Sequence, residues 1–164
     1  MLPGQAWDWV SIFNNLFNFV PRIHISKKKL FWDKGCLHLQ PIAMNWMEAQ
    51  IYCHQFDAYL VEIFDPQQQN LLAAFTESET TEIGKCSPWI GLTNIAQNPG
   101  DWVWMHSLNN TNTNTSYTSW AYDHPIDGLY QHYNFVLMGW GDDYNWVDME
   151  PTYATCSICQ YFPQ

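Results

Sequence analysis

The clearest apolar run in the chain is residues 89–92, Trp-Ile-Gly-Leu, which stands between Pro88 and Thr93. A short apolar run with such boundaries predicts a fully buried central strand, although its periodicity alone also allows a turn of core helix. Gly91 within the run indicates that a neighbouring backbone approaches too closely for a side chain. We therefore expect the domain to be built around this strand.

The apolar residues near the N-terminus follow a helical spacing. Polar residues recur every three or four positions between residues 7 and 20, and the apolar residues share another face: Trp9, Phe13, Leu16, Phe17 and Val20. This pattern predicts an amphipathic helix that ends at Pro21. Three roles are open for it: packing on the domain or on a second copy, a remnant of a stalk or pro-segment, and a membrane-surface helix beside residues 27–29. Its polar face is not basic, so membrane contact is not expected.

A second helical pattern begins after Asn45. This residue can cap a helix in which Glu48 occupies the third position, the arrangement of a capping box. The spacing of the following apolar residues places one set on a common face: Trp46, Ala49, Cys53 and Phe56. We expect this face to pack on the core.

A third helix is predicted to begin at Pro66. Asp65 is a favourable N-cap, and proline suits the first helical position because its missing N–H would have no helical partner there. We expect this helix to continue to about Phe75. Residues 76–85 are polar and are predicted to form a loop.

The remaining apolar stretches predict short strands. Alternation around Cys36 indicates one strand over residues 30–39, and further strands are expected at 59–61, 102–104, 134–138, 144–148 and 155–160. Residues 109–116 are a low-complexity polar stretch that no core would use, so they are predicted to form a surface loop. Asn109 and Asn114 each begin an Asn-x-Ser/Thr sequon within it. Glycosylation and an unmodified loop are both open.

The composition indicates one recognition domain. The 164 residues suffice for a single domain with a real core, and ten Trp exceed what one small core needs, so some aromatic rings are expected at the surface. The net charge of -10 excludes a nucleic-acid partner, which requires a basic face. No apolar run reaches 18 residues, so no transmembrane helix is predicted, and the N-terminus lacks the pattern of an ordinary signal peptide.

The charges divide the chain at about residue 29. Five of the six Lys and Arg residues lie within residues 1–34, so a basic-ended segment, residues 1–29, is predicted to precede an acidic domain, residues 30–164. The five Cys residues, at wide spacings, indicate an oxidising compartment in which disulfides form. We therefore expect a secreted, extracellular protein with one thiol left over.

Several motifs agree in order and spacing with one known family. They are residues 46–53 (WMEAQIYC), the central run at 89–92, residues 102–104 (WVW), 146–148 (WVD) and 158–160 (ICQ). Together they resemble the C-type lectin-like domain over roughly residues 30–161. The resemblance implies an α+β fold in which two helices flank two small antiparallel sheets beside a long loop region. It also implies recognition rather than catalysis, and no common catalytic motif is present, so an enzyme is not expected.

The resemblance implies one disulfide and the loss of another. Cys53 and Cys159 match the family's bridge between the first of the two helices and the last strand. Phe135 and Pro151 stand where the Cys residues of its second bridge would be. Without that bridge, the loop region must be held by packing or by something bound.

The other three Cys residues have no pairing implied by the family. We prefer Cys86 with Cys156, because the strands that they flank can be neighbours. Cys36 would then remain as a thiol or bridge two chains. Sequence alone does not establish this connectivity.

Calcium binding at the usual family site is not expected. Lectins of this family that bind sugar through calcium use a Glu-Pro-Asn or Gln-Pro-Asp tripeptide, a later Glu, and an Asn-Asp pair. With one extra residue allowed in the loop, these positions fall on His124-Pro125-Ile126, Tyr133 and Val147-Asp148. Only Asp148 keeps a calcium-ligand side chain, whereas calcium takes six to eight oxygen ligands. Pro125 is retained, and the resemblance implies a cis bond there.

Other acidic residues nearby leave an alternative to this expectation. Asp127 matches a family position sometimes used for an accessory calcium, and Asp142 and Asp143 could join Asp148 in a shifted site. The simpler interpretation is that they are solvated loop carboxylates. We therefore expect no cofactor, with calcium as the alternative, and no metal site.

Aromatic residues are concentrated in the loop region. Trp104, Trp120 and Trp146 match positions that are often buried in the family, so they are expected in the core. The candidate ligand-binding residues are Tyr122, His124, Ile126, Asp127, Tyr130, Tyr133, Tyr144 and Asp148. Exposed rings on a rigid frame stack on the apolar face of a sugar or dock against a protein.

Two functions follow from these observations. The first is calcium-independent recognition of a glycan or a microbial surface, as in defence lectins. The second is a protein-binding or structural role, in which the acidic loop face meets a basic partner. In that case copies of the chain would assemble through residues 1–28 or Cys36.

Overall fold

The computed structural model describes residues 29–32, 35–95, 101–106, 116–126, 132–140 and 143–161. The helix predicted for residues 7–20 and the sequons at Asn109 and Asn114 lie outside these ranges. The elements are β1 (Lys29–Trp32), β2 (Gly35–Met44), α2 (Trp46–His54), β3 (Tyr59–Leu60), α3 (Pro66–Ile83), β4 (Trp89–Thr93), β5 (Val103–Trp104), β6 (Phe135–Trp140), β7 (Asn145–Met149) and β8 (Thr155–Tyr161).

The strands form a single mixed sheet. Its order is β1-β2-β8-β4-β6-β7, with β3 paired to β8 and β5 paired to β4. All pairs are antiparallel except β4 with β8, which run parallel where Trp89 meets Ser157. This parallel contact joins what the sequence predicted as two small antiparallel sheets. The α+β class is confirmed, and the number of sheets is corrected from two to one.

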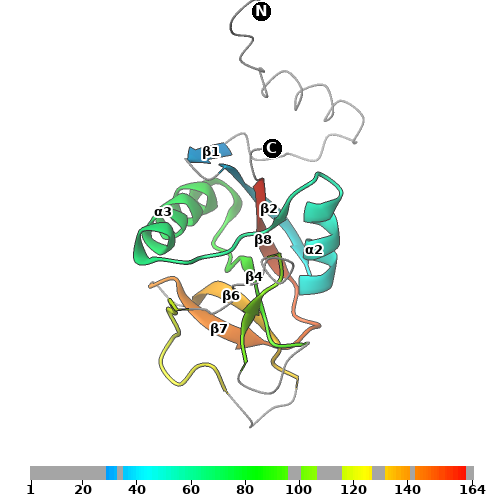
Figure 1. Cartoon of the computed structure of the whole chain (residues 1–164). Coiled ribbons are helices and arrows are strands. Elements are labelled where there is room, and N and C mark those ends of the chain that lie inside the picture. Colours follow the sequence, from blue (N-terminus) through cyan, green and yellow to red (C-terminus); the bar gives the residue numbers. More distant parts are fainter. Residues whose placement is uncertain are drawn as a thin grey trace, which may run out of the picture.

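The two helices lie on either side of the β2–β8 part of the sheet, and β6 and β7 lie beyond it next to the loop region (Figure 1). The alternation of β2 sends its residues to two different core clusters. Leu37 and Leu39 pack in a cluster with Leu72 of α3, whereas Cys36 packs in a cluster with Trp46 of α2. The period of two along the strand therefore gives each helix its own buried contact surface.

The N-terminus of α2 has the predicted capping box. Asn45 Oδ1 accepts from the Glu48 backbone N–H at 2.9 Å, and Glu48 Oε2 accepts from the Asn45 N–H at 3.0 Å. Trp46, Ala49 and Cys53 are fully buried, as their spacing predicts. The helix start and its core face were thus encoded locally.

The length of α3 differs from the prediction. Asp65 caps it as expected, accepting from the Gln68 N–H at 2.8 Å, but the helix continues to Ile83. The prediction of a loop at residues 76–85 is wrong because several polar residues there are buried in the helix. Thr76 has no exposed surface, and its hydroxyl donates to the Leu72 carbonyl oxygen at 2.8 Å.

The prediction of one strand over residues 30–39 is also corrected. The structure has two strands there, β1 and β2, which pair antiparallel with Leu30 opposite Leu37. A hairpin and a single strand share the same alternation of apolar residues, so the period of two does not distinguish them.

The central run forms the buried strand β4. All five of its residues are buried, and the Gly91 N–H donates to the Val61 carbonyl oxygen at 2.8 Å. A Cβ at Gly91 would lie 2.8 Å from the Leu60 carbonyl oxygen. The close approach predicted for this glycine is therefore present.

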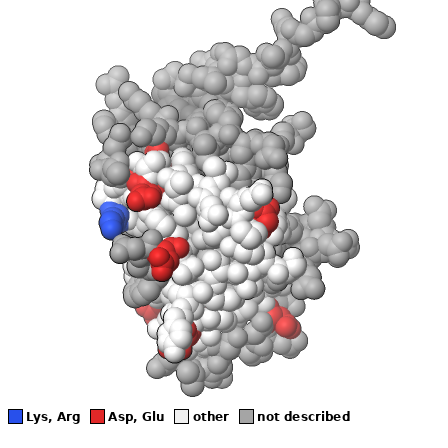
Figure 2. All heavy atoms as spheres, turned by 90° about the vertical axis from the view of Figure 1, so that its left-hand side faces the viewer, with Lys and Arg blue, Asp and Glu red and all other residues white. Residues whose placement is uncertain are grey.

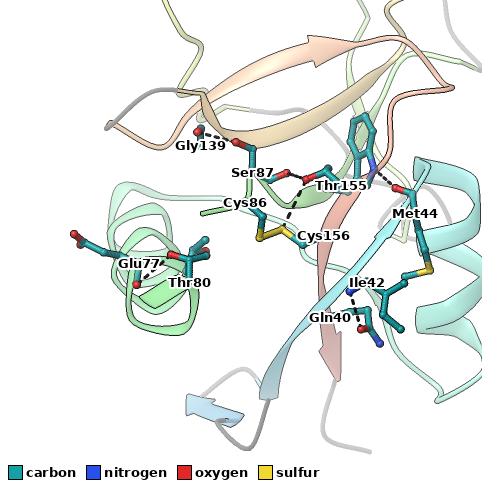
Figure 3. Close-up of a disulfide and its surroundings, with 12 residues drawn as sticks. Gln40, Ile42, Met44, Glu77, Thr80, Cys86, Ser87, Gly139, Thr155 and Cys156 are labelled. Atoms are coloured by element: carbon teal, nitrogen blue, oxygen red, sulfur yellow. Dashed lines mark hydrogen bonds between the residues drawn. A yellow bond between two sulfur atoms is a disulfide. The ribbon is translucent and has the colours of Figure 1, made fainter. Parts of the chain in front are cut away.

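Both expected disulfides end in β8. Cys53 of α2 bonds to Cys159, and Cys86, which follows α3, bonds to Cys156 (Figure 3). Thr155 and Ser87 reinforce the second bridge: Thr155 Oγ1 donates to the Ser87 carbonyl oxygen, and Ser87 Oγ donates to Gly139 in β6, both at 2.9 Å. Two distant helices are thereby attached to one strand.

Cys36 lies buried in β2, opposite Tyr161 of β8. Its Sγ is 3.8 Å from the carbonyl oxygen of Leu37. A bridge between two chains through this thiol would require the edge of the sheet around β2 to open.

Candidate functional site

The candidate site begins at Asp148, whose carboxylate is buried in β7. The residue is 1% exposed, although Asp is rarely buried without partners. Its Oδ1 lies 2.6 Å from His124 Nδ1, in the geometry of an imidazole N–H donating to a carboxylate. The backbone N–H of Ile126 donates to both carboxylate oxygens, at 3.1 and 3.0 Å. We call this arrangement of His124, Ile126 and Asp148 the Asp148 clamp.

The loop that carries the clamp also pairs with β7 through its backbone. The Trp146 N–H donates to the Ser119 carbonyl oxygen at 2.7 Å, and the Ala121 N–H donates to the Trp146 carbonyl oxygen at 2.8 Å. The peptide bond between His124 and Pro125 is cis, as the family resemblance implies. Residues 119–126 are therefore attached to β7 at both ends.

A cluster of aromatic rings is centred on Trp146. The rings of Trp104, Trp120 and Tyr117 lie 5.6, 5.7 and 5.8 Å from it, all close to perpendicular. Edge-to-face packing is favourable for aromatic pairs at such separations. Trp104 and Trp146 are fully buried, as predicted, and Trp120 is half-buried against the same core.

Gln69 of α3 is a residue that the sequence analysis did not identify. Its Oε1 accepts from Trp146 Nε1 at 2.9 Å, and its Nε2 donates to the Tyr144 carbonyl oxygen at 2.7 Å. One amide therefore connects α3 to the start of β7. The sequence did contain a signal for Gln69, because it lies three residues before Leu72 and therefore on the buried side of the helix. A polar side chain there needs a hydrogen-bond partner.

The other predicted site residues are distributed differently. Tyr122 is 91% exposed and lies two residues before His124. Tyr133 is half-buried. Tyr144 is half-buried and packs against the core. Asp143 is exposed, and Asp127, Tyr130 and Asp142 lie outside the described ranges. The structure thus brings together His124, Ile126 and Asp148 and displays Tyr122 beside them.

The donor set does not fit a calcium ion at the usual family position. Both oxygens of the retained carboxylate already accept hydrogen bonds within the protein, and Val147 beside it is buried and apolar. Within the described ranges, no three His, Cys, Asp or Glu side chains are arranged to hold a metal ion. The loop is therefore held by an imidazole and an amide where a calcium-binding relative would use carboxylates and amide oxygens around the cation.

Comparison with known proteins identifies the family. The model of the family "Lectin C-type domain" matches residues 42–161. The chain belongs to the C-type lectin domain family. A curated relative, asialoglycoprotein receptor 1 of Mus musculus, is 29% identical over 129 residues, which cover 71% of this chain and 41% of the receptor. The chain thus spans less than half the length of this relative.

Solved structures show the same fold. Herring type II antifreeze protein superimposes with a TM-score of 0.69 at 22% identity, covering 84% of this chain and 98% of that protein. The cow C-type carbohydrate-recognition domain of CD23 gives a TM-score of 0.66 at 22% identity, covering 84% and 95%. At these identities the likeness concerns the fold alone.

The family assignment supports a lectin-like recognition role and agrees with the expectation that the chain is not an enzyme. Among the described residues, no helix combines the length and the apolar character that a membrane span requires.

Proposed function

We propose that this chain is an extracellular C-type lectin-like domain that recognises a glycan through exposed loop aromatics, without a bridging calcium ion at the usual family site. The observation that supports this most directly is the Asp148 clamp. Its carboxylate is buried and accepts from both His124 and Ile126, so a cation there would have to displace these hydrogen bonds. Removing donors from a buried carboxylate is costly, and Ile126 and Val147 offer no side-chain oxygen to the cation in return.

Tyr122 is the aromatic ring that we assign to ligand contact. It is 91% exposed, whereas Trp104, Trp120 and Trp146 are buried or half-buried. The loop on either side of it is attached to β7, so the ring is presented on a frame that is already ordered before binding. A preorganised aromatic ring loses little conformational freedom when it stacks on a sugar. Tyr133 and Tyr144, both half-buried, remain further candidates beside it.

The surface charges favour a glycan over a partner held by ion pairs. Figure 2 shows one face of the molecule, on which most of the described surface is uncharged and the acidic residues are scattered. Scattered charges give little focused electrostatic attraction to a basic partner. Neutral hydrogen-bonding and stacking groups suit a sugar better. The disulfides at Cys53–Cys159 and Cys86–Cys156 support an extracellular location.

The ligand assignment is tested by Tyr122→Ala on an array of neutral and microbial glycans, read in calcium and again in chelator. We expect the wild type to be retained equally in both buffers, Tyr122→Phe to be retained, and Tyr122→Ala to be lost. Tyr153→Ala is the matched control, because this tyrosine is also exposed, at 38%, but lies outside the loop. Full retention of Tyr122→Ala with an unchanged circular dichroism spectrum would argue against the assignment.

The calcium part of the proposal is tested by thermal unfolding in excess calcium and in chelator. A cation that binds only the folded state raises the unfolding midpoint by mass action. We expect the same midpoint in both conditions. A higher unfolding midpoint in calcium that is absent in Asp148→Asn would place a calcium site at the clamp and contradict the proposal.

A further inference from the structure

The outward side of α2 carries exposed apolar residues, with the exposed Glu48 and His54 beside them, whereas its inward side packs on the core. Met47 and Ile51, one helical turn apart, are 48% and 57% exposed. Ile42, near the end of β2 and four residues before the helix, is 39% exposed (Figure 3). We call Ile42, Met47 and Ile51 the α2 outer face. Exposed apolar side chains one helical turn apart, on a helix whose other side is already buried, offer a surface for a further contact.

The chain contains a segment whose chemistry matches this face. Residues 7–20 are predicted to form an amphipathic helix, and its apolar stripe includes Phe13 and Phe17 at the same spacing of four as Met47 and Ile51. Apolar stripes of two helices pack against each other through side chains three and four residues apart. Both surfaces would otherwise be exposed to water.

The direction of the chain favours a contact within one molecule. β1 pairs antiparallel with β2, with Lys29 opposite His38 and Trp32 opposite Gly35. The end of β1 at Lys29 is therefore the end that lies nearer to Ile42 along β2.

The length of the link is also sufficient. Ile42 lies four residues beyond His38, which is about 13 Å along a strand. Reaching across α2 adds about one helix diameter, roughly 10 Å. Residues 21–28 provide eight residues, which span up to about 28 Å when extended. A short link also gives a high effective concentration, which favours the segment of the same chain over that of a second copy.

We propose that residues 7–20 dock as a helix on the α2 outer face of their own chain, with Phe13 and Phe17 against Met47 and Ile51. The segment then covers an apolar surface of the domain, and its polar side, which includes Asn14 and Asn15, faces solvent. The docking site lies on α2, apart from the Asp148 clamp, so it does not depend on the ligand proposed for the loop.

Disulfide trapping in the full chain tests the contact. Phe13→Cys with Ile51→Cys is oxidised, and the crosslinked peptides are identified by mass spectrometry. Ile51 is exposed, so the substitution does not remove a core residue. We expect a crosslinked monomer for this pair and little crosslink for the control, Asn15→Cys with Ile51→Cys, since Asn15 lies on the polar side. A crosslinked dimer would assign the face to a second copy, and equal or absent crosslinking in the two pairs would equally overturn the proposal.

A stability measurement provides an independent test with the native cysteines. Met47→Glu with Ile51→Glu, and Phe13→Glu with Phe17→Glu, are each expected to lower the thermal midpoint by roughly 5 °C. Because both pairs break the same contact, combining all four substitutions should lower the midpoint little further. Asn14→Glu with Asn18→Glu adds the same charge to the polar side of residues 7–20 and should leave the thermal midpoint unchanged. Fully additive losses, or no loss for Phe13→Glu with Phe17→Glu, would overturn the proposal.

Discussion

The frame of the molecule and its loop region are held together by different kinds of interaction. The frame, built from α2, α3, β2 and β8, is closed by two disulfides that both end in β8. In the loop region, the described residues 101–106, 116–126, 132–140 and 143–150 take part in neither bond. They are held by the rings around Trp146, by Gln69 and by the Asp148 clamp.

An aromatic contact at Phe135 joins the two regions. Phe135 stands where the resemblance places a cysteine of the family's second bridge. It is buried in β6, and its ring stacks on Trp46 of α2 with 4.6 Å between centroids. A covalent tie is thus absent at that position, and an aromatic contact occupies it.

This difference has a thermodynamic consequence. A disulfide acts largely by restricting the unfolded chain, and it stays intact when the elements that it joins open locally. Ring contacts and hydrogen bonds act in the native state and are lost wherever the structure opens locally. We therefore expect the loop region to open at a lower free energy than the frame.

The largest effect is expected from removing the long-range disulfide of the frame. Cys53→Ala with Cys159→Ala opens a loop with a sequence separation of 106, and the chain-entropy relation gives a loss of about 4–5 kcal/mol. Chemical denaturation measures this change in the free energy of unfolding. Cys86→Ala with Cys156→Ala, at a separation of 70, should cost slightly less. A loss below about 1 kcal/mol would show that the bridge adds little to the frame.

The next largest effect is expected from Trp146→Ala in the loop region. The substitution removes the ring around which Trp104, Trp120 and Tyr117 pack and leaves Gln69 without its indole donor. Truncation of a fully buried Trp costs about 3–5 kcal/mol. Hydrogen exchange should show the loss concentrated in residues 116–126 and 143–149. Equal loss of protection in α2 would contradict the separation of the two regions.

A smaller effect is expected from Asp148→Asn, which weakens the clamp without changing its size. The loss of charge-assisted hydrogen bonds to a buried acceptor costs about 1–3 kcal/mol. The Ile126 amide should exchange faster, while amides of β8 should not change. Asp143→Asn is the control, since this acid is exposed and lies just before β7. Unaltered exchange at Ile126 would mean that the clamp does not hold the loop.

Two tyrosines of the frame are expected to have the smallest effect on stability at neutral pH. At alkaline pH they are expected to have a distinct effect. Burial raises the pKa of Tyr52, although a hydrogen bond with Gln40 opposes this shift. Burial, and then the neighbouring Tyr52 and Cys36, raise the pKa of Tyr161. A pKa that is higher in the folded state than in the unfolded state means that folding favours the neutral phenol. The resulting contribution to folding stability is fully present below the unfolded-state pKa of about 10.

The frame should therefore lose stability as the pH rises above about 10. Urea denaturation between neutral and alkaline pH measures the change, and Tyr52→Phe should reduce its pH dependence. A pH dependence that is the same in Tyr52→Phe and in wild type would indicate that other groups titrate.

The sequence was most informative where the signal and its consequence lie within a few residues. Asn45 and Glu48 specify the start of α2, and Asp65 with Pro66 specifies the start of α3. The end of α3 was missed, because Thr76 and Glu79 are polar residues that only tertiary contacts bury. Propensity is a weak guide when packing decides.

The sequence likewise indicated some features of the candidate site and not others. The sequence indicated that Asp148 alone keeps a calcium-ligand side chain of the family, and that Pro125 is retained. It did not indicate that His124, 24 residues away, would bind the carboxylate, or that Gln69 would reach Trp146 across 77 residues. No periodicity or cap relates such pairs, because their proximity exists only after the chain has packed.

By itself, the sequence determined the two helix starts, the buried central strand and the family, because caps and hydrophobic periods act between neighbouring residues. The tertiary structure alone decided three features: the joining of the strands into one sheet through Trp89 and Ser157, the bond between Cys86 and Cys156, and the closure of the Asp148 clamp. Each depends on segments that are distant in the chain and are brought together by burial of the core. The free energy that selects them comes from packing the whole domain, so it is not encoded in any single stretch.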